Sequence, residues 1–84
     1  METAYQKEQL RRFLIEKLGR PKKIDQVSDG ENLIENGMID SLGIMHLVSY
    51  IEDTFRVKVR DEEIVPDNFE SLDVISTYVS RLHH

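Results

Sequence analysis

The residues with the clearest chemical potential lie in one short stretch, residues 37–42 (GMIDSL). Asp40 is a good N-cap, and no proline occurs between Ser41 and Phe55, so we expect a helix to begin here. The Ser41 hydroxyl would then project at the helix N-terminus, where unpaired N–H groups and the helix dipole favour an attached phosphate. An isolated Asp-Ser pair is ordinarily only capping chemistry, so its meaning depends on the residues around it.

Other chemistries lack the residues that they need. The chain has no Cys, so the polypeptide itself offers no thiol, no disulfide and no thiolate metal site. Ser41, His46 and Asp40 are the residue types of a catalytic triad, but they lie within about one and a half helical turns and would not converge. A calcium loop starting at Asp25 fails because Val27 occupies a ligand position. We therefore expect no catalytic residue, no metal site and no enzyme.

The segment before this stretch predicts one long helix and one long loop. Leucines recur at every fourth position from 10 to 18, which predicts an amphipathic helix over about residues 3–18. Gly19, by left-handed capping, and Pro21, by steric exclusion, are expected to end it. The connection over residues 20–39 has no sustained period, but its isolated apolar residues indicate that it is pinned across the core. A short helical turn is expected around residues 24–27.

The stretch after the serine predicts a long helix and then a short one. The long helix covers about residues 40–55, and its expected buried strip consists of Ile44, Val48, Ile51 and Phe55. The short third helix is predicted over residues 61–65, with Asp61 as its cap and Pro66 as its stop. Residues 57–59 alternate like a strand but would have no partner strand, so we interpret them as loop.

The last predicted helix covers residues 71–82, with Ser71 as its N-cap. Its expected apolar strip consists of Leu72, Ile75, Val79 and Leu82. Together these patterns predict a single all-α domain over residues 1–84. It would be a four-helix bundle with three long helices, a short third helix and a long loop between the first two helices.

The stretch 37–42 gains its meaning from the residues that follow it. Downstream stand an apolar residue and a Glu-x-x-Phe pattern, within the set Leu47, Ile51, Glu52 and Phe55. This combination resembles the attachment-site signature of the acyl carrier and peptidyl carrier family, in which Asp-Ser-Leu begins a helix. Residues 61–63 (DEE) stand where carrier proteins begin their short third helix, and residues 66–69 (PDNF) resemble the lead into the fourth. The resemblance spans at least residues 33–79.

This resemblance implies an acyl-carrier-like fold and a covalent cofactor, 4′-phosphopantetheine, on Ser41. The cofactor ends in a thiol, the group that the polypeptide lacks, and thiols form reactive thioesters with acyl or aminoacyl groups. The resemblance also implies the partners. A phosphopantetheinyl transferase would attach the arm, an acyl- or aminoacyl-activating enzyme would load it, and downstream acyltransferases or synthases would use the cargo. A carrier that visits several enzymes is expected to be a monomer.

The expected partner surface lies around the serine and on the short third helix. Leu42 and Met45 fall off the buried strip, which favours partner contact over packing. Ile64 and Val65 are assigned equally to the core and to partner or cargo contact. The full predicted set is Asp40, Leu42, Met45, Ser49, Glu52, Asp53, Ile64 and Val65.

The second helix departs from the strongly acidic form that is common in carriers of bacterial fatty acid synthesis. It offers only Glu52 and Asp53 as acids, and His46 occupies a position that is often acidic in those proteins. This favours a freestanding carrier of a specialised pathway that makes a polyketide, a nonribosomal peptide or a modified lipid or sugar. The alternatives are a housekeeping fatty acid synthesis carrier and an unmodified interaction module with the carrier fold.

The charge of the chain constrains its partners. A formal charge of −5 disfavours nucleic acid, because phosphate binding needs a basic face. Residues 1–23 carry a net +4 and the remainder a net −9, which fits a solvated surface or an acidic face that attracts basic partners. No apolar run is long enough for a signal peptide or a membrane span, so we expect a cytoplasmic protein without membrane contact. His83 and His84 are either native or the remains of a purification tag.

Overall fold

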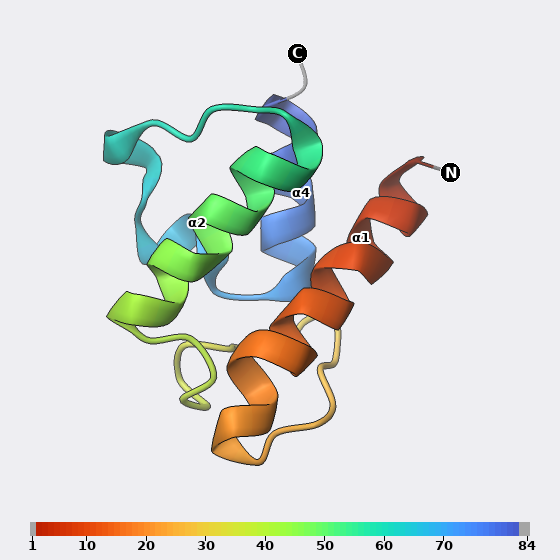
Figure 1. Ribbon diagram of the computed structural model, residues 1–84, viewed down its shortest axis with the longest axis vertical. Coiled ribbons are helices and arrows are strands. Elements are labelled where there is room, and N and C mark those ends of the chain that lie inside the picture. The colour runs from red at the N-terminus through yellow and green to blue at the C-terminus, as the bar shows by residue number, and fades with distance from the viewer. Residues whose placement is uncertain (1, 83–84) are drawn as a thin grey trace.

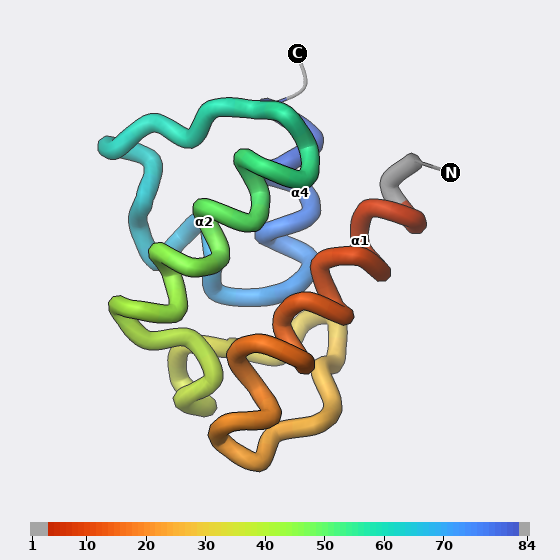
Figure 2. Tube along the Cα trace, in the orientation of Figure 1, coloured from red at the N-terminus to blue at the C-terminus, as the bar shows by residue number. Residues whose placement is uncertain are grey.

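Four helices form the framework of the described chain, residues 2–82 of the computed structural model (Figure 1). They are α1 (Glu2–Phe13), α2 (Ser41–Phe55), α3 (Pro66–Phe69) and α4 (Leu72–Leu82). Residues 2–82 contain no strand, so the predicted all-α, four-helix fold is confirmed. Figure 2 shows the long loop after α1 crossing one end of the bundle before it reaches α2. The prediction about His83 and His84 lies outside the described residues.

The first helical run is longer and less regular than predicted. After α1 it continues as a wider π-helical segment, Leu14–Gly19 (η1), and ends in a 3₁₀ turn, Arg20–Lys22 (η2). The predicted left-handed cap at Gly19 is wrong, because Gly19 is right-handed (φ −82°, ψ −50°) and Lys23 is the left-handed residue (φ 62°). Pro21 lies in the first turn of η2, where its missing N–H leaves no internal hydrogen bond unmade.

Gly19 is needed for a different reason from the predicted one. It is buried where the chain turns back over the end of η1, and its carbonyl accepts a hydrogen bond from Ile24 N–H at 2.8 Å. A Cβ at this position would collide with the Ile24 carbonyl oxygen and would lie 2.9 Å from Met38 Cε. The absence of a side chain therefore lets the loop close against the helix.

The long loop, residues 23–40, is pinned across the core, as predicted. Its buried apolar side chains are Val27, Leu33, Met38 and Ile39. Its backbone is also tied to the C-terminal part of the chain. The Leu33 N–H donates to the Glu70 carbonyl oxygen at 2.7 Å, and the Asp73 N–H donates to the Asp29 carbonyl oxygen at 2.9 Å. These long-range bonds allow a loop of this length to hold one conformation.

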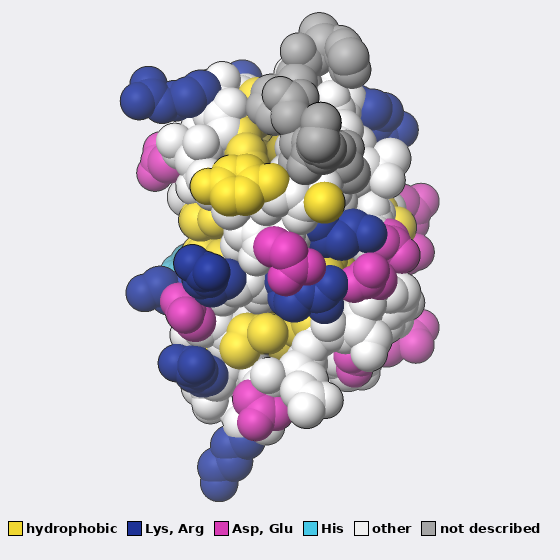
Figure 3. Space-filling model, turned by 90° about the vertical axis from the view of Figure 1, so that its right-hand side faces the viewer, with side chains coloured by type: hydrophobic (Ala, Val, Ile, Leu, Met, Phe, Trp, Pro, Cys, Tyr) yellow, Lys and Arg dark blue, Asp and Glu magenta, His cyan; other side chains and the backbone are white. Residues whose placement is uncertain are grey.

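Basic side chains of α1 hold the same loop by charge. The Arg11 guanidinium binds the Asp29 carboxylate and the Val27 carbonyl oxygen, and Lys7 Nζ lies 3.5 Å from the Asp29 carboxylate and 2.7 Å from that of Asp73 in α4. Part of the uneven charge of the sequence is thus paired within the fold, and Figure 3 shows basic and acidic side chains intermixed on one face. The helical turn expected over residues 24–27 is wrong, because the Val27 carbonyl bonds to Arg11 and the described loop forms no turn there.

The segment between α2 and α4 differs from its prediction. Residues 57–59 are loop, as expected, but the helix predicted over 61–65 is only a 3₁₀ turn, Asp61–Glu63 (η3). Pro66 begins α3 instead of ending a helix, because a proline fits the first turn of a helix without loss of a hydrogen bond. The Ser71 hydroxyl accepts from the Val74 N–H at 3.2 Å at the start of α4, as a cap should.

The buried face of α2 is centred differently from the predicted strip. Leu47 and Ile51 are fully buried, whereas Ile44 and Phe55 are half-buried at the edge of the core. The rest of the core comes from the leucines of the first helical run, from the long loop, and from α3 and α4. No helix of the described chain is both long and apolar enough to cross a membrane.

Candidate functional site

Ser41 is the first residue of α2, and it is exposed. Asp40, directly before it, has an extended backbone (φ −115°, ψ −172°) and is the N-cap of the helix. Asp40 Oδ1 accepts a hydrogen bond from the Gly43 N–H at 2.7 Å, as the sequence predicts. This cap fixes where α2 begins and therefore fixes the backbone position of the serine.

Lys22 holds the backbone in front of the serine, a role that no motif in the sequence indicates. Its Nζ lies 3.0 Å from Asp40 Oδ2 and donates to the carbonyl oxygens of Gly37 at 2.8 Å and Met38 at 3.3 Å. The Gly43 N–H, and then the Lys22 ammonium, hold the pKa of the Asp40 carboxyl below its usual range. Asp40 is therefore ionised at neutral pH and links the helix start to the end of the first helical run.

The turn that leads into the site depends on further local bonds. Gly37 has a positive φ (87°), which glycine adopts without steric cost. Asn36 Oδ1 accepts from the Met38 N–H at 2.9 Å, and the Ile39 N–H donates to the Leu33 carbonyl oxygen at 2.9 Å. These bonds fix the course of the backbone up to the N-cap.

The arrangement fits a phosphate ester on the serine. Within residues 2–82 the Ser41 hydroxyl has no hydrogen-bond partner, so its oxygen is available for modification. The positive end of the α2 dipole and the Lys22 ammonium beside Asp40 both stabilise negative charge in this region. The described residues contain no group of three or more His, Asp or Glu side chains that could hold a metal ion.

The predicted partner residues of α2 that lie nearest to the serine are exposed. Leu42 is 67% exposed and Met45 is 52% exposed, and neither belongs to the core. Ser49 and Asp53 are also exposed, further along the helix. The structure therefore places an apolar surface beside Ser41 and polar residues towards the other end of α2.

The remaining predicted partner residues are more strongly engaged within the fold. Glu52 Oε2 accepts a hydrogen bond from the Val59 N–H at 2.9 Å, so this carboxylate holds the loop after α2. Ile64 is half-buried and packs against the core, whereas Val65 is 38% exposed. The sequence assigns Ile64 and Val65 equally to the core and to partner or cargo contact. In the structure Ile64 lies at the core and Val65 lies at the surface.

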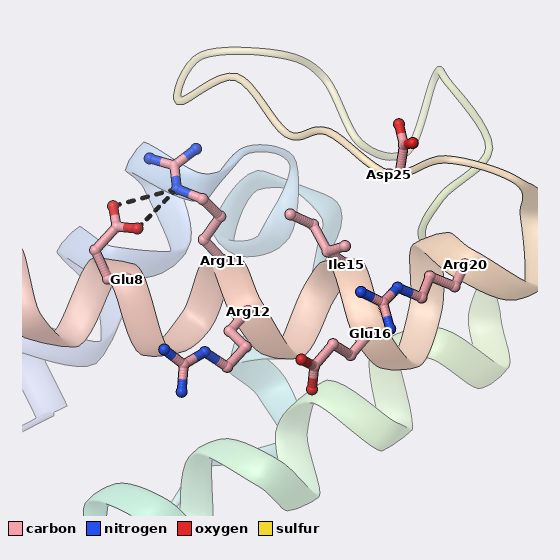
Figure 4. A pocket seen from close by; sticks show the side chains of 7 residues that line it. All are labelled: Glu8, Arg11, Arg12, Ile15, Glu16, Arg20 and Asp25. Atoms are coloured by element: carbon pink, nitrogen blue, oxygen red, sulfur yellow. Dashed lines mark hydrogen bonds and ion pairs between the residues drawn. The ribbon is translucent and has the colours of Figure 1, made fainter.

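Two depressions lie on the surface of the first helical run. One, of about 150 Å³, adjoins the serine and is bounded by residues 17–22 on one side and by Asp40 and Leu42 on the other. The other, of about 340 Å³, has mainly charged walls: Glu8, Arg11, Arg12, Glu16, Arg20 and Asp25. Figure 4 shows its opposed charges, with Arg11 bound to Glu8. Neither Ser41 nor its chain neighbours line this second depression, so it does not extend the site.

Comparison with known proteins agrees with this geometry. The sequence pattern of the family described as "Phosphopantetheine attachment site" matches residues 8–79. The D-alanyl carrier proteins of Streptococcus pyogenes serotype M5 (strain Manfredo), serotype M49 (strain NZ131) and serotype M1 are each 35% identical to the chain over 54 residues. These matches cover 64% of this chain and 68% of each relative.

The family model covers most of the chain, so the resemblance to acyl and peptidyl carriers is confirmed. Carrier proteins of this kind hold 4′-phosphopantetheine on a serine and are not themselves enzymes. They work with a phosphopantetheinyl transferase and with enzymes that activate or transfer acyl groups. The chain therefore belongs to the phosphopantetheine attachment-site family of carrier proteins.

Proposed function

We propose that this chain carries an acyl or aminoacyl group for a specialised biosynthetic pathway, on a 4′-phosphopantetheine arm attached to Ser41. The observation that supports the site most directly is the exposed Ser41 hydroxyl, which lies beside the capping Asp40 and has no hydrogen-bond partner among residues 2–82. A phosphopantetheinyl transferase would form the bond from Ser41 Oγ to the phosphorus of coenzyme A that bears the pantetheine. That bond replaces the P–O bond to adenosine 3′,5′-bisphosphate, and the hydroxyl proton passes to a base of the transferase. The terminal thiol of the arm holds cargo as a thioester.

A small aminoacyl group is our preferred cargo. The relatives compared above are named D-alanyl carrier proteins, which points to an amino acid and not to a long acyl chain. The start of α2 also lacks the acidic character of fatty acid carriers. Its first turn contains no acid, and His46 is exposed one turn after Leu42. Partner enzymes with strongly basic docking surfaces would find little charge to bind at this end of the helix.

Partner contact is proposed to centre on Leu42 and Met45. Both are exposed apolar side chains beside the attachment serine, and enzymes that visit a carrier must reach the arm from this side. Asp40 would contribute its carboxylate to the same region, and Ser49, Asp53 and Val65 would extend it. Because a carrier binds and releases its partners repeatedly, the interface should be small and weak.

Intact mass spectrometry tests the attachment site. The protein is incubated with coenzyme A, magnesium and a broad-specificity phosphopantetheinyl transferase, beside the variants Ser41→Ala and Ser49→Ala. Ser49 is a matched control because it is an exposed serine on the same helix. We expect one phosphopantetheinyl group on the wild type and on Ser49→Ala, and none on Ser41→Ala. Failure of the folded wild type with both this transferase and its own would support the unmodified interaction module instead.

A second experiment tests the cargo. The modified protein is offered to a D-alanine-activating enzyme and, separately, to an enzyme that loads long acyl chains, each with ATP. We expect a mass gain of one alanyl group in the first reaction and a slower gain or none in the second. Efficient loading with the long acyl chain alone would favour the fatty acid synthesis carrier.

A further inference from the structure

The smaller of the two depressions, a groove of about 150 Å³, opens directly beside the attachment serine. Its lining includes Asp40 and Leu42, the two chain neighbours of Ser41, and the opposite wall is formed within residues 17–22. Figure 1 places these segments together at one end of the molecule, far from the loop that follows α2. A group attached to Ser41 therefore begins its course at the edge of this groove.

The groove combines an apolar floor with a basic rim. Leu18 and Met38, which line it, belong to the buried core, and Leu42 is an exposed apolar residue at its edge. On the rim, Lys22 is paired with Asp40, whereas Lys17 has no ion-pair partner within residues 2–82. A ligand that complements these walls has a negative charge next to a compact apolar group.

We propose that the groove is the resting site of the first part of the 4′-phosphopantetheine arm, namely its phosphodiester and the dimethyl-substituted carbon that follows. This inference rests on the proposed function, because it requires the arm on Ser41. The phosphodiester carries a negative charge that can pair with Lys17, which has no ion-pair partner within residues 2–82. The two methyl groups are compact and apolar, as contact with Leu18 and Leu42 requires.

The size of the groove decides how much of the arm it holds. Sites that enclose a whole drug-sized ligand have volumes of about 300–1,000 Å³. The groove, at about 150 Å³, is half the lower limit and takes only the part of the arm nearest to the serine. The amide groups and the thiol remain outside it, where an activating enzyme can reach the thiol.

The resting arm and a docked partner would compete for one side chain. Leu42 lines the groove and is also the exposed apolar residue next to the serine. A partner that packs on Leu42 would take the apolar contact that the resting arm makes with this side chain and so favour release of the arm. Docking and release of the arm would thus be coupled without any change in the helices.

NMR of the modified protein tests this resting site directly. Mass spectrometry first establishes that Ser41 carries the arm. We then expect nuclear Overhauser effects between the two arm methyl groups and the methyl groups of Leu18 and Leu42. Fully modified protein without these effects would overturn the resting site and leave the proposed function intact. A protein that accepts no arm would overturn the proposed function itself.

A charge reversal at the rim tests the electrostatic part. In Lys17→Glu we expect these effects to weaken about two- to fivefold, the factor that one exposed charge pair supports. Lys58→Glu is the matched control, because Lys58 is also exposed but lies in the loop after α2, outside the groove. Thermal melts verify that both variants fold. Unchanged effects in Lys17→Glu, or an equal loss in both variants, would overturn the assignment.

Discussion

A carboxylate stabilises each end of α2, but the two carboxylates do so in different ways. At the N-terminal end, Asp40 caps the helix and binds Lys22, which leaves Ser41 exposed. At the C-terminal end, Glu52 turns back to accept the Val59 N–H and so holds a loop. The first arrangement fixes the backbone and leaves side chains free for chemistry. The second uses the side chain of Glu52, a predicted partner contact, to anchor the loop within the fold.

Glu63, the last residue of η3, repeats the second arrangement. Glu63 Oε1 accepts a hydrogen bond from the Tyr78 hydroxyl at 2.8 Å, and the Glu63 carbonyl oxygen accepts from Asn68 Nδ2 at 2.8 Å. Acidic residues at this end therefore join loop to helix. An acid in the sequence of a carrier is thus weak evidence for a partner surface unless its own hydrogen bonds are known.

The largest loss of stability is expected from a substitution at Gly19, where the long loop closes against the first helical run. In Gly19→Ala the new methyl group meets the Ile24 carbonyl oxygen and Met38 Cε, so the loop must shift. We expect the free energy of unfolding to fall by about 2–3 kcal/mol, measured by urea denaturation. Gly30→Ala is the control, because a Cβ at Gly30 meets nothing within 4 Å. Equal stability of the two variants would show that the loop adapts freely.

The next largest effect should follow the loss of the cap. Asp40→Ala removes the acceptor of the Gly43 N–H and the partner of Lys22. We expect the Tm to fall by about 8 °C, which corresponds to about 1.5 kcal/mol, and the modification of Ser41 to slow. Asp25→Ala, which removes an exposed acid of the long loop outside the proposed partner surface, should change neither Tm nor modification rate. A fall in Tm with an unchanged modification rate would mean that the cap serves stability alone.

The same carboxylate gives this end a pH dependence. Because the folded state lowers the pKa of Asp40, the stabilisation is present above the unfolded pKa of about 3.9 and is lost as the pH falls through the folded value. Asp40→Asn keeps a cap acceptor but removes the charge. The stability difference between the wild type and Asp40→Asn should therefore shrink as the pH is lowered below about 4 in thermal melts. A difference that is constant from pH 7 to pH 3 would contradict this.

A smaller effect, and a different one, is expected at the other end of α2. Glu52→Ala removes the acceptor of the Val59 N–H, and we expect a loss of about 1 kcal/mol in the free energy of unfolding. Modification of Ser41 should proceed at the wild-type rate, because the cap and the Lys22 contacts are untouched. Slower modification in Glu52→Ala than in Asp40→Ala would reverse the comparison between the two ends.

The sequence predicts features that depend on neighbouring residues and misses those that depend on distant ones. The start of α2 was predicted because the Asp40 cap and its donor are three residues apart. Lys22 was missed because only the fold brings it to Asp40, eighteen residues along the chain. Pro66 was assigned to the wrong side of a helix, since proline fits a helix start as well as it disrupts a helix interior.

The smallest effect is expected at the anchor between Tyr78 and Glu63. Tyr78→Phe keeps the ring, which packs edge-on against Phe69, and removes only the hydroxyl that donates to Glu63. We expect a loss of about 0.5 kcal/mol at pH 7, by urea denaturation. Burial, and then the hydrogen bond to Glu63, raise the pKa of Tyr78 above its usual value, so the folded state favours the neutral phenol. The stabilisation is therefore present below the unfolded pKa of about 10 and is lost as the pH rises towards the folded value. The wild type should approach Tyr78→Phe in stability above pH 10, and a gap that widens there would contradict the anchor.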